Sequence, residues 1–418
     1  MSWIIAGLMY RYWRTNDEVV TRAARLWIRI FALTFAVGVA SGIALEFQFG
    51  ANWAAYSRFV GDIFGAPLAA EVVFTFFLES TFLAMLVLGW GRLSRGVHFL
   101  SAVLVAVGAT LSAFWILVAN SWMQTPAGYT MVNGRPELAS FAAAVFNPST
   151  LPRFLHTVDA CLMTGAFFVL GLSAILLLRR RQREVARLSF NIALLVAFAA
   201  SVLQLGAGHF HAVQVAQTQP EKLAAFEGLY VTQAHAPLLI FGIPDPAART
   251  VHYAIKIPGM LSWLATGDPR AVVRGLNDFG DDIPPIALTF YPFHLMVAFG
   301  LYFIGVTLLG LFLWWRNALH DNRLFLRLAI VTLPLPLLTN ELGWIAAEVG
   351  RQPWIVYRLM RTADAVSITV PPAQIAISLG AFAVVYSVLL AAWIAFIRRE
   401  LHREPAPESI TPQPEVSA

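Results

Sequence analysis

Acidic and imidazole side chains interrupt stretches of this sequence that are otherwise almost entirely apolar. Glu71 and Glu79 lie in one such stretch, between residues 68 and 90. His156 lies near the start of another, and Glu348 ends a third. An acidic residue at the centre of a membrane-spanning helix costs about 2.5–3.5 kcal/mol of insertion free energy, whereas a leucine returns only about 0.5 kcal/mol. We therefore expect these side chains to face partners inside a helical bundle.

The spacing of the two carboxyl groups in the first stretch limits their chemistry. On an ideal helix, eight residues correspond to about 80° of rotation and about 12 Å of rise. Glu71 and Glu79 therefore cannot share one metal ion, but they can mark two points on one path. Proton relay is the usual role of a carboxyl group within a membrane span.

The elements that position these residues are predicted to be membrane-spanning helices. The chain has 418 residues, of which 58% are hydrophobic, well above the share typical of soluble domains. Apolar runs of about 20 residues, enough to cross a bilayer, recur at 26–48, 67–90, 99–120, 155–178, 188–208, 286–315, 326–348 and 371–397. Residues 1–13 add an apolar piece that is too short to span. The sequence thus predicts an all-α polytopic membrane protein with eight full spans and a truncated first helix.

The basic residues predict the orientation of these spans. Arginines cluster in alternate loops, which the positive-inside rule places in the cytoplasm: Arg11, Arg14, Arg22 and Arg25; Arg92 and Arg95; Arg179, Arg180, Arg181, Arg183 and Arg187; Arg316 and Arg323; Arg398, Arg399 and Arg403. The loops at 49–66, 121–154, 209–285 and 349–370 then face outward, and the C-terminus is cytoplasmic. Because the net charge of +5 comes from the ends of spans, it does not indicate nucleic-acid binding.

The chain is predicted to form one membrane domain over residues 1–403, with a solvated, disordered tail over 404–418. The outer loop at 209–285 is the one large hydrophilic insertion, and a helix start near Pro220 predicts a short amphipathic helix on the outer surface. Cys161 is the only cysteine, which excludes internal disulfides, iron–sulfur clusters and covalent haem attachment. Any haem must then be held by axial ligands and packing.

With this topology, the depth of each candidate can be estimated from the helical rise. His156, Met296, Glu71 and Glu348 are expected in the outer half of the membrane, and Glu79 nearer the middle. This arrangement favours a row of cofactors. Each residue also has an ordinary interpretation: a histidine can bond to a neighbouring helix, a methionine usually fills space, and a glutamate near an interface can extend to it.

Five longer motifs carry a resemblance to a known family. Residues 348–354 read EVGRQPW, and the others are EFQFGANW at 46–53, GDIFGAPL at 61–68, FLEST at 77–81 and WILVANSWMQ at 115–124. The sequence resembles cytochrome bd-type quinol oxidase subunit I from about residue 25 to residue 397. Because several motifs occur in the same order, chance similarity is not a serious alternative.

The resemblance implies three haems and their surroundings. His156 and Met296 match the axial ligands of a low-spin haem b, and Glu348 matches the ligand of a high-spin haem b. Glu71 matches the acidic residue beside haem d, although a third haem b at that site stays open. Other positions match residues of the proton route and haem pockets: Ser112, Glu79, Asn120, Trp344 and Arg351.

The resemblance also implies a quinol site and protein partners. Lys222 and Glu227 match outer-loop residues linked to quinol oxidation, although an exposed surface charge is the alternative for Lys222. The only other lysine, Lys256, lies in the same loop. Five residues correspond to about 140° on an ideal helix, so joint contact would need a bent helix or an intervening ligand. A second membrane subunit is the expected partner, and a small single-span subunit is an additional candidate.

The sequence departs from the family pattern in two places. The family begins with a complete first span whose histidine ligates a haem, whereas no histidine precedes His98 here. We expect a start farther upstream, and the alternative is a missing ligand. The second departure is His294, two residues before Met296 and about 200° from it on a helix. Met296 is the expected ligand, and His294 is expected at a haem propionate or on the quinol side.

The sequence is therefore interpreted as the haem-bearing subunit of a terminal quinol oxidase of a bacterial inner membrane. Quinol would be oxidised at the outer face, and oxygen would be reduced to water with cytoplasmic protons. Two alternatives stay open. One is a non-catalytic haem-binding relative without the first-helix ligand. The other is a proton- or cation-coupled transporter, which would not need His156 and Met296 at matched depth.

Overall fold

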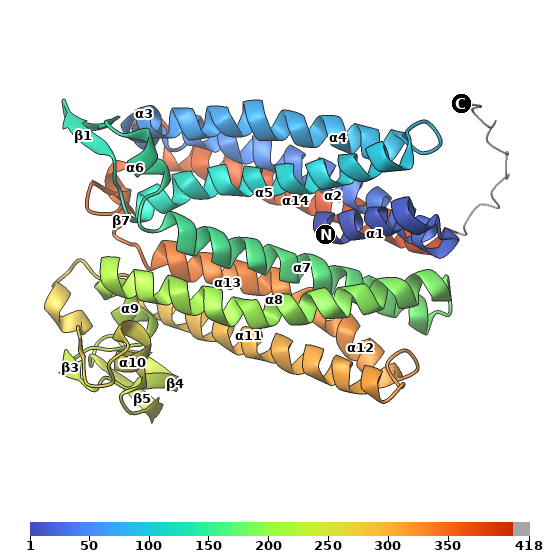
Figure 1. The fold of residues 1–418 in the computed structure, drawn as a ribbon. Coiled ribbons are helices and arrows are strands. Elements are labelled where there is room, and N and C mark those ends of the chain that lie inside the picture. The colour runs from blue at the N-terminus through green and yellow to red at the C-terminus, as the bar shows by residue number, and fades with distance from the viewer. Residues whose placement is uncertain (404–418) are drawn as a thin grey trace.

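The computed structural model describes residues 1–403, and the long helices lie side by side in one bundle (Figure 1). Within this range, eight helical segments are long and apolar enough to cross a membrane: Glu18–Ala51, Ala54–Leu88, Arg95–Gln124, Thr150–Leu178, Arg183–Thr218, Ile286–Trp315, Arg323–Val349 and Pro372–His402. The all-α class and the eight predicted spans are confirmed. The predicted tail at 404–418 lies outside the described residues.

Six of these spans are single helices, namely α2 (Glu18–Ala51), α5 (Arg95–Gln124), α7 (Thr150–Leu178), α8 (Arg183–Thr218), α11 (Ile286–Trp315) and α14 (Pro372–His402). The other two are composite. One joins α3 (Ala54–Ala70), a π-helical turn (Glu71–Phe76) and α4 (Phe77–Leu88), and the other joins α12 (Arg323–Thr332) and α13 (Leu335–Val349).

The prediction of an outer loop at 49–66 is wrong, because most of this segment is helical. α3 begins at Ala54, and its residues Tyr56, Val60 and Phe64 recur at helical spacing and are buried. They pack in one hydrophobic cluster with Trp122 of α5. Burial of this face explains why a segment interrupted by polar residues still forms a helix.

The first helix is short, as predicted. α1 (Ser2–Thr15) contacts α2 and α5, and its residues Ile5, Leu8 and Met9 are almost fully buried. The chain then turns at Asn16, which has a left-handed backbone. Asp17 caps α2, since its Oδ1 accepts hydrogen bonds from the backbone N–H groups of Val19 (2.7 Å) and Val20 (3.1 Å).

The centre of the bundle is built on α7 and α8. α7 carries a long series of buried residues, and α8 places small buried residues against the core at Ala193, Ala197 and Ala200. Small side chains let membrane helices approach closely. The closer approach increases van der Waals contact, which matters because no hydrophobic effect drives helices together within lipid. This pairing positions the ends of α5, α11 and α13 around one region.

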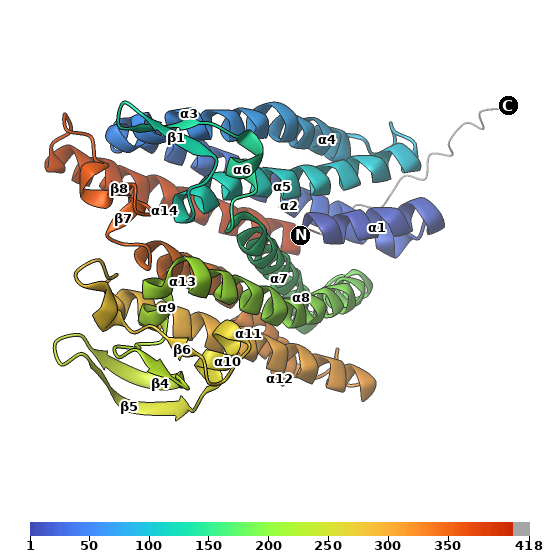
Figure 2. The ribbon, with the colours of Figure 1, turned by 60° about the vertical axis from the view of Figure 1, so that its left-hand side comes forward.

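The two ends of the bundle differ. Short turns and arginines gather at one end, where ion pairs join separate helices, such as Arg22 with Glu184 (3.0 Å) and Arg29 with Glu400 (2.7 Å). The other end carries three small hairpins and the large insertion (Figures 1 and 2). The hairpins are β1 (Tyr129–Val132) with β2 (Arg135–Leu138), β7 (Trp354–Val356) with β8 (Met360–Arg361), and β4 (Leu238–Asp245) with β5 (Thr250–Ile257).

The insertion is more structured than the sequence suggested. It contains α9 (Pro220–Phe226), the β4–β5 hairpin, α10 (Met260–Thr266) and a short pair of β3 (Gln233–Ala234) with β6 (Val272–Val273). The helix near Pro220 is present, but its predicted surface position is wrong. Its residues Leu223, Ala224 and Phe226 are buried in a cluster with residues of α8 and α11.

Candidate functional site

The C-terminal end of α13 places a carboxylate among donors from several elements. Glu348 Oε1 accepts hydrogen bonds from the amides of Asn120 and Gln124, both at 3.1 Å. Arg351 donates to the other oxygen, with 2.6 Å between Nη2 and Oε2. Asn120 and Gln124 are four residues apart on α5, so they share one face of that helix. The carboxylate is therefore held in a fixed orientation by one cation and two amides.

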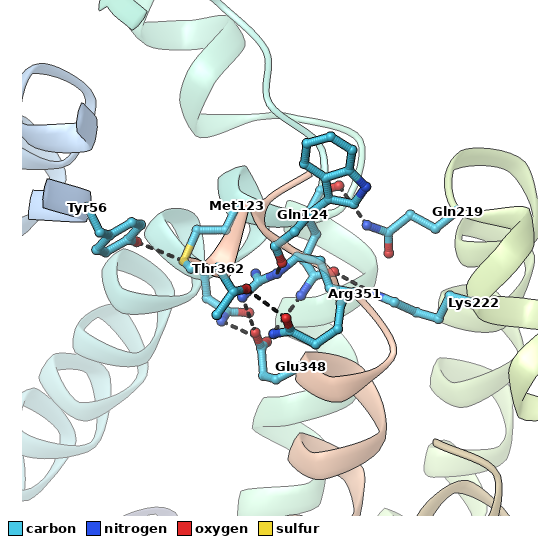
Figure 3. Close-up of polar contacts among 11 residues, drawn as sticks. Tyr56, Met123, Gln124, Gln219, Lys222, Glu348, Arg351 and Thr362 are labelled. Atoms are coloured by element: carbon cyan, nitrogen blue, oxygen red, sulfur yellow. Dashed lines mark hydrogen bonds and ion pairs between the residues drawn. The ribbon is translucent and has the colours of Figure 1, made fainter. Parts of the chain in front are cut away.

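A buried lysine from the insertion joins this cluster. Lys222 is 1% exposed, and its Nζ donates to Gln124 Oε1 at 2.5 Å. Figure 3 shows Lys222 of α9 and Glu348 of α13 both reaching the Gln124 side chain. Burial, and then the nearby Arg153 guanidinium, lower the pKa of Lys222 well below its usual range. The exposed surface position considered for Lys222 is therefore wrong, and Gln124 connects the insertion to Glu348.

Several donors at this end of the bundle have no partner within residues 1–403. Arg153 is 3% exposed, and its Nε atom has no hydrogen-bond partner within that range. Arg351 is also buried, and its Nη1 atom has no hydrogen-bond partner there either. The Nε2 atom of His211, on α8, is also buried and unpaired. Buried donors are normally paired, and arginine cannot give up its charge. These groups fit an anionic ligand, such as the propionate carboxylates of a haem.

The two predicted axial ligands of the low-spin haem lie against glycines of neighbouring helices. A Cβ atom built on Gly208 of α8 would lie 3.5 Å from His156 Cε1. A Cβ built on Gly343 of α13 would lie 3.0 Å from Met296 Sδ. The amide of Gln204 lies 3.2 Å from His156 Nδ1. A side chain at position 343 would therefore crowd Met296, whereas one at position 208 would make only an ordinary contact with His156.

The acidic residues of the composite span lie farther from the insertion than predicted. Because this helix starts at Ala54, Glu71 is about 25 Å along it rather than a few residues deep. Glu71 Oε1 accepts a hydrogen bond from Ser112 Oγ at 2.8 Å. Ser112 precedes Asn120 by eight residues on α5, so the partners of Glu71 and Glu348 are about 12 Å apart along that helix. Glu71 therefore lies deeper along its span than the sequence indicated.

Glu79 lies one step farther along the same span. Its side chain is 5% exposed, and no hydrogen bond or ion pair to its carboxyl group is present within residues 1–403. A Cβ atom built on Gly108 of α5 would lie only 2.6 Å from Glu79 Cγ. The two helices therefore meet closely at this carboxyl group. Thr75, in the π-helical turn between the two glutamates, donates to the Glu71 backbone carbonyl.

The remaining predicted residues lie around these groups. Trp344 is half-buried on α13, one turn before Glu348. His294 faces the insertion, with its Nε2 3.0 Å from the backbone oxygen of Leu239 in β4. Glu227 Oε2 accepts a hydrogen bond from the Leu239 backbone N–H at 3.3 Å, and burial raises the pKa of Glu227 to about 8. Lys222 and Glu227 thus have different partners, and β4 lies between Glu227 and His294.

Sequence reasoning missed the groups that connect these residues. Gln124 and Arg153 were not singled out, although Gln124 ends the motif at 115–124. Its position four residues after Asn120 was an available signal, because the two share a helical face. Nothing in the local sequence around Arg153 shows that the arginine is buried. Within the described chain, no group of three or more His, Cys, Asp and Glu residues could hold a metal ion by itself.

Comparisons with known proteins agree with this geometry. A model of the family described as cytochrome bd terminal oxidase subunit I matches residues 1–405. A Bacillus subtilis protein, cytochrome bd ubiquinol oxidase subunit 1, is 39% identical over 414 residues, which cover 96% of this chain and 88% of that protein. The Escherichia coli cytochrome bd-II ubiquinol oxidase subunit 1 is 35% identical, over 96% of this chain and 91% of that protein.

The fold is shared as well. A chain in the structure of bd oxidase from Geobacillus thermodenitrificans aligns with a TM-score of 0.89 and 33% identity, covering 97% of this chain and 93% of that one. Family membership implies haem cofactors and a partner subunit. The unpaired arginine donors described above fit such cofactors. This polytopic membrane protein belongs to the cytochrome bd terminal oxidase subunit I family.

Proposed function

We propose that this chain is the haem-bearing subunit of a quinol oxidase of a bacterial cytoplasmic membrane, working with a second membrane subunit. A small single-span subunit is an additional candidate partner. Quinol is oxidised at the end that carries the insertion, which faces outward, and oxygen is reduced to water with protons from the arginine-rich, cytoplasmic end. The C-terminus then lies in the cytoplasm.

One observation carries this proposal above the others. Within the described chain, the fully buried Lys222 of the insertion is linked through Gln124 to Glu348 of a spanning helix. Burying a lysine is expensive unless its ammonium is compensated. The link joins the proposed quinol side to a proposed haem ligand by two hydrogen bonds. A surface loop that plays no part in the function of the helical bundle would not need this link.

The proposed roles of the other residues follow from their positions. His156 and Met296 would hold a low-spin haem b, Glu348 a high-spin haem b, and Glu71 would lie beside haem d or a third haem b. When bound, these groups would supply electron transfer from quinol to oxygen. Arg153 and Arg351 orient carboxylates at this end, and Trp344 provides a flat surface for packing.

Two further groups of residues position the substrate and the protons. Lys222, Glu227 and His294 surround the insertion side, where quinol is proposed to bind. Glu71, Ser112 and Glu79 line the composite span, where they would hold and move protons. Ser112 keeps the Glu71 carboxyl group aligned with α5, and Glu79 continues the line toward the cytoplasmic end.

The test is a visible spectrum and an oxygen-consumption assay of the purified complex with its partner subunit. We expect haem absorption and quinol-dependent oxygen uptake. Met296→Leu should abolish the low-spin haem spectrum, whereas His294→Ala should retain it. The reverse result would exchange the two assignments. A colourless complex would reject the proposal in favour of the transporter, and haem absorption without oxygen uptake would favour the non-catalytic relative.

A further inference from the structure

A second buried acid stands next to Lys222, and the roles above do not use it. Glu221 on α9 is 6% exposed. Its Oε1 accepts a hydrogen bond from the Tyr357 hydroxyl at 2.6 Å. Its other oxygen, Oε2, is buried and has no partner within residues 1–403. A buried acceptor that stays unpaired is rare and points to an absent partner such as water or a ligand.

Tyr357 connects this acid to the outer surface. It lies between β7 and β8, where its backbone N–H donates to the Met123 carbonyl of α5 at 2.9 Å. Tyr357 is one of the residues that line a cavity of about 350 Å³, together with others that include Thr125, Tyr129 and Thr218. Water in this cavity would therefore meet one side of Tyr357, and Glu221 meets its hydroxyl.

The chemistry of the pair suits proton exchange. Burial, and then its hydrogen bond to Glu221, raise the pKa of Tyr357 above the usual tyrosine range. The phenol therefore keeps its proton at neutral pH. It can pass protons on by giving up one while accepting another, without forming a phenolate. Glu221 is also coupled electrostatically to Lys222, whose charge it favours.

We propose that Glu221 and Tyr357 form the outlet through which protons from quinol oxidation reach the outer cavity. This inference rests on the proposed function. A quinol loses two protons and two electrons in becoming a quinone, and the electrons reduce oxygen. As each quinol O–H bond breaks, its proton goes to the Glu221 carboxylate. The protonated Glu221 then donates to the Tyr357 oxygen, while the Tyr357 hydroxyl turns away from Glu221 and releases its own proton to water in the cavity.

The experiment uses the complete haem-loaded complex with its partner subunit. Steady-state quinol oxidation is compared among wild type, Glu221→Ala, Glu221→Gln and Tyr357→Phe. We expect kcat to fall about 100-fold for both Glu221 variants, at the lower end of the usual range for a lost proton-transfer group. For Tyr357→Phe we expect a smaller loss of about 10-fold, below that range, because water from the cavity can replace the hydroxyl. The KM for quinol and the haem spectrum should stay unchanged. Added formate should restore turnover to Glu221→Ala, because a small acid can enter from the cavity.

A matched control separates this role from a structural one. Tyr129 lines the same cavity, and its ring packs on Trp122 rather than on Glu221. Tyr129→Phe should keep the wild-type kcat. Unchanged kcat in Glu221→Gln and Tyr357→Phe would overturn the outlet, and so would a loss in Glu221→Ala that formate does not relieve. Absence of quinol oxidation by the wild-type complex would instead reject the proposed function.

Discussion

Glu348 and Glu79 are both carboxyl groups within spans, yet their surroundings are opposite. Glu348, at the end with the insertion, pairs with Arg351 and accepts from two amides. Glu79 is buried where the composite span meets α5, without a hydrogen bond or ion pair within residues 1–403. A carboxylate fixed by a cation and donors suits a permanent anchor. A buried carboxyl group without such partners suits the uptake and release of a proton.

Removing the cation should have the largest effect. Arg351→Met would leave the Glu348 carboxylate, whose side chain is 31% exposed, without its buried ion-pair partner. Breaking a fully buried pair costs about 3–5 kcal/mol, and this partly exposed pair should cost somewhat less. We expect a large fall in the thermal unfolding midpoint, together with loss of the haem absorption assigned to Glu348.

An exposed ion pair at the same end provides the control. Arg361 and Asp282 lie 2.7 Å apart, and each is about half exposed. Arg361→Met should cost less than about 1 kcal/mol, because solvent screens such pairs. Equal losses in the two variants would show that Arg351 is no more than a surface charge.

Removing the unpaired carboxyl group should affect turnover rather than the fold. Glu79→Ala is expected to slow oxygen reduction by about 100-fold or more, as for other lost proton-transfer groups. The low-spin haem spectrum should remain. Oxygen uptake and the reduced-minus-oxidised spectrum, measured on one preparation, report both properties.

A neighbour on the same helix is the control for this variant. The Ser80 hydroxyl bonds to the backbone oxygen of Phe76, one turn earlier. Ser80→Ala should therefore keep nearly full turnover. Undiminished oxygen uptake in Glu79→Ala would remove Glu79 from the proton path and would erase the contrast with Glu348.

The packing against Glu79 can be tested with a single methyl group. In Gly108→Ala, the new Cβ would lie 2.6 Å from Glu79 Cγ, so the Glu79 side chain or one of the two helices must shift. Overpacking of this kind costs about 1–3 kcal/mol. We expect a lower unfolding midpoint and slower oxygen uptake.

Gly61 of α3 is the matched control, because a Cβ there meets no atom within 4 Å. Gly61→Ala should be neutral or should stabilise the protein by up to about 1 kcal/mol through helix propensity. If Gly108→Ala behaves like Gly61→Ala, the close contact between α5 and Glu79 is not needed.

The smallest effect concerns Glu227, the buried acid of the insertion. Its pKa is raised to about 8, above the value of about 4.3 for an unfolded chain. The stability that this group contributes is thus complete below about pH 4.3 and is lost as the pH rises through about 8. We expect the wild-type unfolding midpoint to fall by a few degrees over this window, and Glu227→Gln to flatten the fall.

Glu137 of the β1–β2 hairpin lies at the same end and serves as the control for that series. Glu137→Gln should follow the wild-type pH dependence. If Glu227→Gln also follows it, Glu227 does not hold its proton in the folded protein. The acid would then resemble Glu348, which has charged partners, more than Glu79.

The sequence alone determined the number of spans and the separation of arginines from the insertion. Both depend on local properties, because the length of an apolar run and the charge at its ends are read directly from composition. The motifs also identified the family. Candidate residues that lie within a single helix, such as His156 and Glu348, could be proposed in this way.

Tertiary structure alone decided how the residues are partnered. Gln124 connects Lys222 to Glu348, residues that lie 98 and 224 positions away from it. The burial of α9 and the depth of Glu71 were likewise hidden. Contacts of this kind depend on where each helix starts, on its rotation and on the neighbour it packs against. A periodic pattern in one segment carries no information about the segment on the other side of the contact.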